Sequence, residues 1–247
     1  MSRWKAAGIH LSISVLIGLI VLTLLFVVWY PAPYFQATGG LDLTLILLGI
    51  DLVLGPLLTL IVFKAGKPGL KFDLAVIITL QAAALVYGLH VITSARPAYI
   101  VGAVDRFVVV AANEIEPADL ADARDPQFAS ISWTGPRLVA ARLPTDPQER
   151  SELAFSGFAG RDVQNLPRYY VEYAEEAANL LTRAKPLADL RGKGPDAAAA
   201  IDTWLREHAK PESELVWLPI DARKASLTML LDARTAAVVG TIDIDPN

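Results

Sequence analysis

Residues 41–63 read LDLTLILLGIDLVLGPLLTLIVF. This stretch is long enough to cross the hydrocarbon core of a bilayer, which takes roughly 20 consecutive apolar residues. Its middle carries one acidic residue, Asp51, and an acid at that depth costs at least about 2.5–3.5 kcal/mol to insert. Gly55 and Pro56 follow one turn later, where proline removes a backbone hydrogen bond and glycine lets a neighbour approach closely. We therefore expect a membrane helix that is interrupted at Pro56 and offers Asp51 to a partner, a water-filled pocket or a proton.

Two further apolar runs, at about 9–30 and 74–92, predict two more membrane spans beside 41–63. The first run exceeds the apolar core of a cleaved signal peptide, which is about 7–15 residues long, so we expect a retained helix. Aromatic residues follow it, as in the interfacial belt of membrane proteins. The third run carries Gln81 near its middle and the small-residue pair Ala84-x-x-x-Gly88, a spacing that allows close helix contact.

The basic residues near these spans predict their orientation. Arg3 and Lys5 precede the first span, and three lysines lie between the second and third spans, whereas 31–40 carries no charge. Cytoplasmic loops of membrane proteins carry the excess of Lys and Arg. The N-terminus is therefore expected in the cytoplasm and residues 97–247 on the outside, which in a bacterium is the periplasm.

Charge divides the chain into two expected domains, a transmembrane domain at 1–96 and a soluble domain at 97–247. The first has a net charge of +3 and the second of −7, which together give the −4 of the whole chain. The acidic second part would repel phosphates, so nucleic acid is not an expected partner. The chain has no cysteine, which excludes thiol catalysis, disulfides and thiolate metal sites.

The soluble part predicts an α+β domain with an antiparallel sheet. Strands are expected where β-branched and aromatic residues cluster, and helices where proline or an N-cap residue opens a suitable run. The expected strands are 99–112 (one bent or two short), 128–133, 137–143, 215–220, 225–231 and 236–244. The expected helices begin near Pro117, at Asp146-Pro147, after the loop 160–173 and at Pro195.

No catalytic motif is present: the chain has no phosphate-binding loop, no HExxH and no GxSxG. His10 and His90 belong to opposite ends of the predicted spans and His208 to the soluble part, so they cannot share a metal ion. Surface or helix-capping positions are expected for all three histidines. The sequence predicts neither an enzyme nor a metal or cofactor site.

Two features have both a structural and a functional interpretation. Asp51 could hydrogen-bond Gln81, Thr23 or Ser14 and so join the spans, or it could contact a partner directly. The second feature is a set of three tyrosines, Tyr169, Tyr170 and Tyr173. They could pack in the domain core, as tyrosines often do, or form a contact surface, because tyrosine is enriched at interfaces.

Short motifs occur along the chain in a recognisable order. They are Gly49–Leu57, Arg96–Tyr99, Val104-Asp105-Arg106-Phe107, Gly135-Pro136, Pro144-x-Asp146, Gly160-Arg-Asp162 and Pro167-Arg-Tyr-Tyr170. Together with three spans ahead of a soluble domain, this series resembles the type IV pilin accessory proteins of the TfpX/TfpZ type over most of the chain.

The resemblance implies a non-catalytic accessory protein or chaperone of the bacterial inner membrane. Such a protein would bind a cognate type IV pilin, through the pilin's transmembrane helix and its head domain, before assembly, and so promote pilin stability and pilus biogenesis. The candidate pilin-binding residues are Asp51, Gly55, Pro56, Gln81, Asp105, Arg106, Phe107, Tyr169, Tyr170 and Tyr173. The alternative is a non-catalytic structural or signalling membrane subunit of the pilus assembly machinery.

Overall fold

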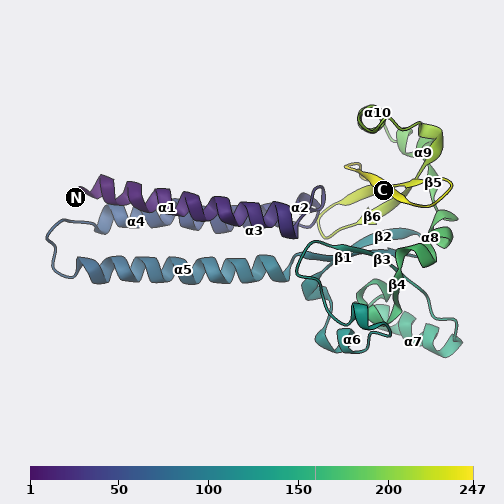
Figure 1. The fold of residues 1–247 in the computed structure, drawn as a ribbon, viewed down its shortest axis with the longest axis horizontal. Helices are drawn as coiled ribbons and strands as arrows, with labels where there is room; N and C mark the ends of the chain where they lie inside the picture. The colour runs from purple at the N-terminus through teal and green to yellow at the C-terminus, as the bar shows by residue number, and fades with distance from the viewer. Residues whose placement is uncertain (159, 247) are drawn as a thin grey trace.

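The computed structural model describes residues 1–158 and 160–246. Three long apolar helices lie side by side, and a domain built on one curled sheet follows at one end of them (Figure 1). The N-terminus and the connection 63–69 lie at the other end of the bundle, far from the sheet. This arrangement confirms the predicted fold class of a membrane bundle followed by a soluble α+β domain.

Each of the three helices is long and apolar enough to cross a membrane. The first consists of α1 (Arg3–Leu24) and a π-helical end (Leu25–Trp29); the second of α3 (Gly40–Gly49), a π-helical segment (Ile50–Leu54) and α4 (Gly55–Val62); the third is α5 (Leu70–Ser94). The short helix α2 (Tyr34–Ala37) lies in the connection between the first two. The observed helices begin earlier than the expected spans, at Arg3 and Leu70.

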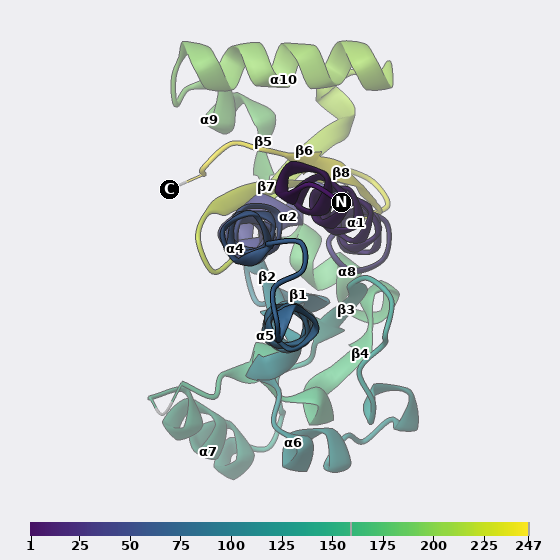
Figure 2. The ribbon, with the colours of Figure 1, turned by 90° about the vertical axis from the view of Figure 1, so that its left-hand side faces the viewer.

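The second span packs against both of the others. α1 lies along α4, and α5 lies along α3 and α4, as the view along the bundle shows (Figure 2). Gly88 permits one of these contacts, because a Cβ at this position would lie 2.4 Å from Leu47 Cδ1. The small residue predicted to allow close packing in the third span therefore does so.

The soluble domain contains an eight-stranded sheet with the order β4-β3-β1-β2-β6-β7-β8, and β5 pairs with β6. The strands are β1 (Pro97–Ala103), β2 (Arg106–Ala111), β3 (Arg137–Ala141), β4 (Tyr170–Glu172), β5 (Lys185–Pro186), β6 (Leu215–Asp221), β7 (Ser226–Asp232) and β8 (Val238–Ile242). The sheet is mixed and not purely antiparallel as expected, because β1 pairs with β3, and β2 with β6, in parallel.

Helices cover both faces of this sheet. Alternate residues of a strand point to opposite faces; accordingly, Tyr99 and Val101 belong to one core and Ile100 to the other. The first core is closed by α6 (Pro117–Ala121) and α7 (Pro147–Phe158), the second by α8 (Tyr173–Leu181). A third core joins α9 (Leu187–Arg191) and α10 (Pro195–His208) to the C-terminal strands.

One expectation for the soluble part was wrong, and strand β4 was not expected. The segment 128–133 is not a strand: a 3₁₀ turn, Pro126–Phe128, buries Phe128 against Tyr170, and the chain then bends toward the bundle. The helix expected after the loop 160–173 is confirmed as α8, which begins at Tyr173, but Tyr170–Glu172 at the end of that loop pairs with β3 as the edge strand β4. A three-residue strand is too short to show a periodic pattern.

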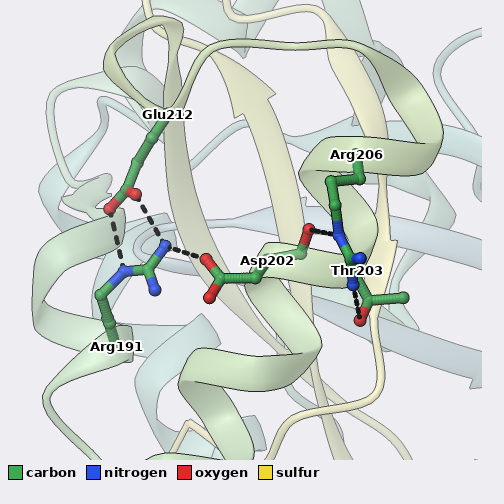
Figure 3. Close-up of polar contacts among 5 residues, drawn as sticks. All are labelled: Arg191, Asp202, Thr203, Arg206 and Glu212. Carbon is green, nitrogen blue, oxygen red and sulfur yellow. Dashed lines mark hydrogen bonds and ion pairs between the residues drawn. The ribbon is translucent and has the colours of Figure 1, made fainter.

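One arginine joins three elements in the C-terminal part of the domain. Arg191 of α9 donates to Asp202 of α10 and to Glu212 of the following turn, each at 2.8 Å (Figure 3). Arg206, by contrast, donates to the Asp202 carbonyl and to Thr203 on its own helix. Arg191 therefore fixes α9, α10 and this turn relative to one another.

The sheet domain is attached to the bundle by the connection between the first two spans. Tyr34 and Ala37 of this connection are buried in the second core of the soluble domain. The hairpin between β6 and β7 reaches back to the same place, where Lys224 N donates to the Ala37 carbonyl at 2.8 Å. The Lys224 ammonium also forms an ion pair with Asp42 at the start of α3. The soluble domain is thus held against the end of the bundle that lies opposite the N-terminus.

Candidate functional site

The candidate site begins where the second span changes from α to π geometry. Pro56 has no N–H, so the carbonyl one turn before it, that of Leu52, lacks its usual helical donor. The π-helical segment Ile50–Leu54 lies directly before this position and contains Asp51. Single π turns inside α-helices often occur at functional sites. Asp51 is 8% exposed, although it lies within a helix of membrane-spanning length.

Polar and small residues form one face of the second span. Asp51, Gly55 and Thr59 are four residues apart, so they lie on the same side of the helix, and all three are buried. Gly55 leaves room for the amide of Gln81 on α5, since a Cβ at position 55 would lie 2.0 Å from Gln81 Nε2. The sequence predicted that Gly55 would admit a neighbouring backbone; the structure places a polar side chain there.

The first span contributes a second polar face. His10 and Ser14 are one turn apart on α1 and face the second span. His10 Nδ1 lies 2.6 Å from Thr59 Oγ1, and Ser14 is 6% exposed. His10 therefore joins two spans and does not occupy the expected surface or capping position. His208 does cap its own helix, because its Nδ1 lies 2.9 Å from the Trp204 carbonyl.

These faces meet around a cavity of about 450 Å³ between the three spans. Its polar lining comes from all of them: His10, Ser14, Asp51, Thr59 and Gln81. The rest of the lining is apolar and extends from mid-bundle to the end where Met1 and Phe63 lie. The cavity thus occupies the half of the bundle that is farther from the soluble domain.

Several polar atoms in this cavity have no hydrogen-bond partner. Within the described residues, Asp51 and Ser14 make no side-chain hydrogen bond, and Gln81 Oε1 is buried without one. Thr23, one of the expected partners of Asp51, is exposed and donates to the Leu19 carbonyl of its own helix. A carboxyl group and a carboxamide therefore remain available to a group that enters the cavity from outside.

The candidate residues of the soluble domain lie elsewhere. Asp105 and Arg106 form the exposed turn between β1 and β2, where Arg106 donates to Asp105 and, at 2.9 Å, to Asp221. The hydrogen bond and charge of Arg106 hold the pKa of Asp105 below its ordinary value. Phe107 is fully buried in the second core. This motif fixes the β1–β2 turn to β6 and leaves Asp105 and Arg106 accessible.

The three tyrosines do not form a common exposed surface. Tyr169 and Tyr170 belong to the first core and are 2% and 3% exposed. Tyr173 packs against the second core beside Phe107, and its hydroxyl donates to the Ala236 carbonyl at 2.5 Å. The structure therefore favours the interpretation that they are core residues, and we do not include them in a partner contact.

The site offers no arrangement for metal binding. Within 1–158 and 160–246, no group of three His, Cys, Asp or Glu side chains is placed to hold a metal ion. The cavity chemistry is instead that of hydrogen bonding and apolar contact within the spans.

Comparison with known proteins identifies the family. The chain is 31% identical over 245 residues to a fimbrial assembly protein of serogroup I from Dichelobacter nodosus, covering 98% of this chain and 95% of the relative. The chain belongs to the fimbrial assembly protein family. This membership agrees with the resemblance to type IV pilin accessory proteins that the motifs indicated, and it confirms that prediction.

Other comparisons within the fimbrial assembly family agree. The serogroup E1 protein of the same organism is 30% identical over 245 residues, and the protein of serogroups C1 and C2 is 36% identical over 114 residues, which is 45% of this chain and 86% of that relative. The family model described as "Fimbrial assembly protein FimB" matches residues 1–39, which include the whole first span. No solved structure matches the chain significantly.

Proposed function

We propose that this protein is a non-catalytic accessory protein, or chaperone, of pilus biogenesis that binds a cognate type IV pilin in the inner membrane before assembly. The family supports a role in pilus assembly, because its named members are fimbrial assembly proteins. The cavity between the spans supports the binding step. The observation that carries the proposal is the buried carboxyl of Asp51, which faces this cavity without a hydrogen-bond partner.

A partner helix with a polar group would change the energetics of this carboxyl. An acid inside a bilayer is costly and usually faces a partner or a cavity. A donor or cation on the pilin helix, placed opposite Asp51, would replace the missing hydrogen bond. The amide of Gln81 lies beside the same cavity and could accept or donate a second bond. Apolar lining residues such as Ile78 and Leu85 would contact the rest of the docked helix.

The position of the cavity specifies which part of the pilin helix would dock. The basic residues near the spans support a cytoplasmic N-terminus and a periplasmic soluble domain. In that orientation the cavity lies in the cytoplasmic half of the bilayer. A pilin with its head in the periplasm would therefore present the cytoplasmic half of its transmembrane helix. Its head would then lie on the same side as the soluble domain.

Photocrosslinking from two faces of the bundle tests this proposal. A photoreactive residue at Ile78, which lines the cavity, should form an adduct with pilin, whereas one at Val53, which is 60% exposed and lies outside the cavity lining, should not. The Ile78 adduct should persist in cells blocked in pilus assembly, because capture precedes assembly. Equal adducts from both positions, or adducts with assembly-machine subunits only, would contradict capture and favour the structural-subunit alternative.

Substitutions of Asp51 identify the chemistry of the contact. Asp51→Leu should abolish the pilin adduct and lower pilus yield. Asp51→Asn should preserve both if the residue acts as a neutral hydrogen-bonding group, and should resemble the leucine variant if it pairs with a cation. Thr44→Val is the matched control, because the Thr44 hydroxyl is also buried in the second span but donates to the Gly40 carbonyl of its own helix. Unchanged adducts and pilus yield in Asp51→Leu would refute the docking role.

A further inference from the structure

The loop 129–136 returns from the soluble domain to the outer end of the bundle. Gly135 N donates to the Val28 carbonyl at 2.7 Å, and the Ser132 carbonyl accepts a hydrogen bond of 3.0 Å from Arg96. Between these two contacts, the Trp133 ring meets the Trp29 ring edge to face, with centroids 5.8 Å apart. The loop is therefore bound to the ends of two spans.

These contacts define the depth of Trp133 relative to the spans. Trp29 is the last residue of the first candidate span, and Arg96 follows the end of the third, at Ser94, by two residues. The Tyr30 hydroxyl donates to the Ile92 carbonyl at 2.8 Å, so the two span ends lie at the same level. Trp133 consequently lies where the hydrocarbon core of a bilayer gives way to the headgroups.

Trp133 is the exposed tryptophan next to the sheet domain's end of the spans. It is 64% exposed, whereas Trp29, Trp204 and Trp217 are 6%, 8% and 2% exposed; Trp4, near the N-terminus at the other end of the bundle, is 72% exposed. Indole rings favour this membrane level because they combine an apolar body with one N–H donor. An exposed indole beside two span ends therefore has the position and chemistry of an interfacial anchor.

Arg96 holds the loop from the inside. Its guanidinium lies 5.1 Å from the centre of the Trp133 ring and donates to the Thr93 carbonyl at 2.6 Å as well as to Ser132. Arg96 is 7% exposed and forms no ion pair within the described residues. It acts as a positioning residue that orients the indole outward.

We infer that Trp133 inserts into the headgroup–acyl boundary of the bilayer, so that loop 129–136 anchors the soluble domain to the membrane surface. The lipid interface is the occupant because the loop continues the surface formed by two span ends. This inference does not depend on the pilin. It adds a fourth membrane contact, made by the soluble domain itself, to the three spans.

A spin label beside Trp133 tests the inference directly. The chain has no cysteine, so a single cysteine can be introduced and labelled without removing others. Thr134→Cys places the label on the exposed neighbour of Trp133, and Phe158→Cys, at a position 90% exposed on α7, serves as the water-exposed control. The full-length protein is reconstituted without pilin in phosphatidylcholine nanodiscs. Collision of the label with oxygen and with a water-soluble nickel complex is then measured.

The two labels should differ several-fold in the ratio of oxygen to nickel accessibility, because oxygen concentrates in the bilayer and the nickel complex does not. Adding Trp133→Ala to the Thr134→Cys variant should shift this ratio toward that of position 158. Equal ratios at 134 and 158 would overturn the inference. Shielding of position 134 from both reagents would also overturn it, since it would show a protein surface covering the loop. An unchanged thermal unfolding transition in the Trp133→Ala background verifies that the domain remains folded.

Discussion

Gln81 occupies the space that a side chain at position 55 would need. A Cβ built on Gly55 would lie 2.0 Å from Gln81 Nε2 and 2.6 Å from Gln81 Cδ. The two residues belong to different spans, and both belong to the polar faces around the cavity. The missing side chain of Gly55 thus determines where the amide of Gln81, near the middle of the third span, can lie.

Gly55→Ala should destabilise the bundle by about 1–3 kcal/mol, the usual cost of overpacking a filled site. The double variant Gly55→Ala/Gln81→Ala should recover most of this loss, because the amide that would clash has been removed. Thermal unfolding of the purified protein in detergent measures both effects. Gly49→Ala is the control, since nothing lies within 4 Å of a Cβ at that position. A double variant no more stable than Gly55→Ala alone would contradict the assigned contact.

The free energy of unfolding should depend on pH through the protonation of the Glu176 carboxyl. Burial raises its pKa, while hydrogen bonds from Arg142 and Asn179 lower it, and the net pKa lies below the ordinary value of 4.5. The unfolded chain therefore binds this proton at higher pH than the folded chain. The stabilisation is fully present above pH 4.5 and is lost as the pH falls through the lower folded pKa.

Arg142→Gln should weaken this acid dependence, because only the hydrogen bond from Asn179 would then oppose the effect of burial on the Glu176 pKa. Unfolding by urea, followed at several values between about pH 3 and 6, gives the slope of the free energy of unfolding for each variant. Lys193→Gln removes the same charge at a residue without an ion-pair partner in the described chain, and should leave the slope unchanged. Equal slopes in wild type and Arg142→Gln would disprove the assignment.

Arg191 and Arg206 should differ in their effect on local opening. Arg191→Gln breaks contacts to two other elements, so amide exchange in α9 and in the turn 212–214 should become faster. Arg206→Gln breaks contacts within α10 and should affect that helix alone. Hydrogen exchange read by mass spectrometry distinguishes the two. Identical exchange patterns in both variants would show that Arg191 does not join the elements.

The ion pair between Lys224 and Asp42 should contribute little stability, below about 1 kcal/mol, since both side chains are more than half exposed. Lys224→Asp should nevertheless cost more than Lys224→Ala, because it places two acids together. The exchange Lys224→Asp/Asp42→Lys should restore stability close to the wild-type value. A double-mutant cycle on thermal unfolding measures the coupling, and Lys210→Asp controls for the change in net charge. A coupling free energy of zero between positions 42 and 224 would contradict a stabilising ion pair.

The sequence alone indicated the spans and most of the strands because those signals are local. A run of roughly 20 apolar residues predicts a membrane span, and a short β-branched run predicts a strand, without reference to the rest of the chain. The parallel pairing of β2 with β6 joins segments more than 100 positions apart in the numbering, and no local pattern reports such a pairing. The loop 129–136 escaped prediction for a related reason: its conformation depends on the bundle it contacts.

The site was partly predictable. Asp51, Gly55 and Gln81 were chosen for their polarity or size inside apolar runs. In the structure Asp51 and Gln81 line one cavity, and Gly55 lies against Gln81. Thr59 and His10 were not chosen, although a signal exists. Thr59 continues the four-residue spacing of Asp51 and Gly55, and His10 precedes Ser14 by one turn. The sequence favoured a core position for the three tyrosines over a contact surface, since buried tyrosines are common, and Tyr169 and Tyr170 are buried.

The contact of Lys224 with Asp42 joins positions 182 residues apart. The chain is synthesised from its N-terminus to its C-terminus, so the first two spans and their connection are made well before the β6–β7 hairpin. The contacts of Lys224 with Ala37 and Asp42 can therefore form only after this hairpin has been synthesised. A chain truncated before the hairpin would retain its spans but lack these contacts at the end of the bundle.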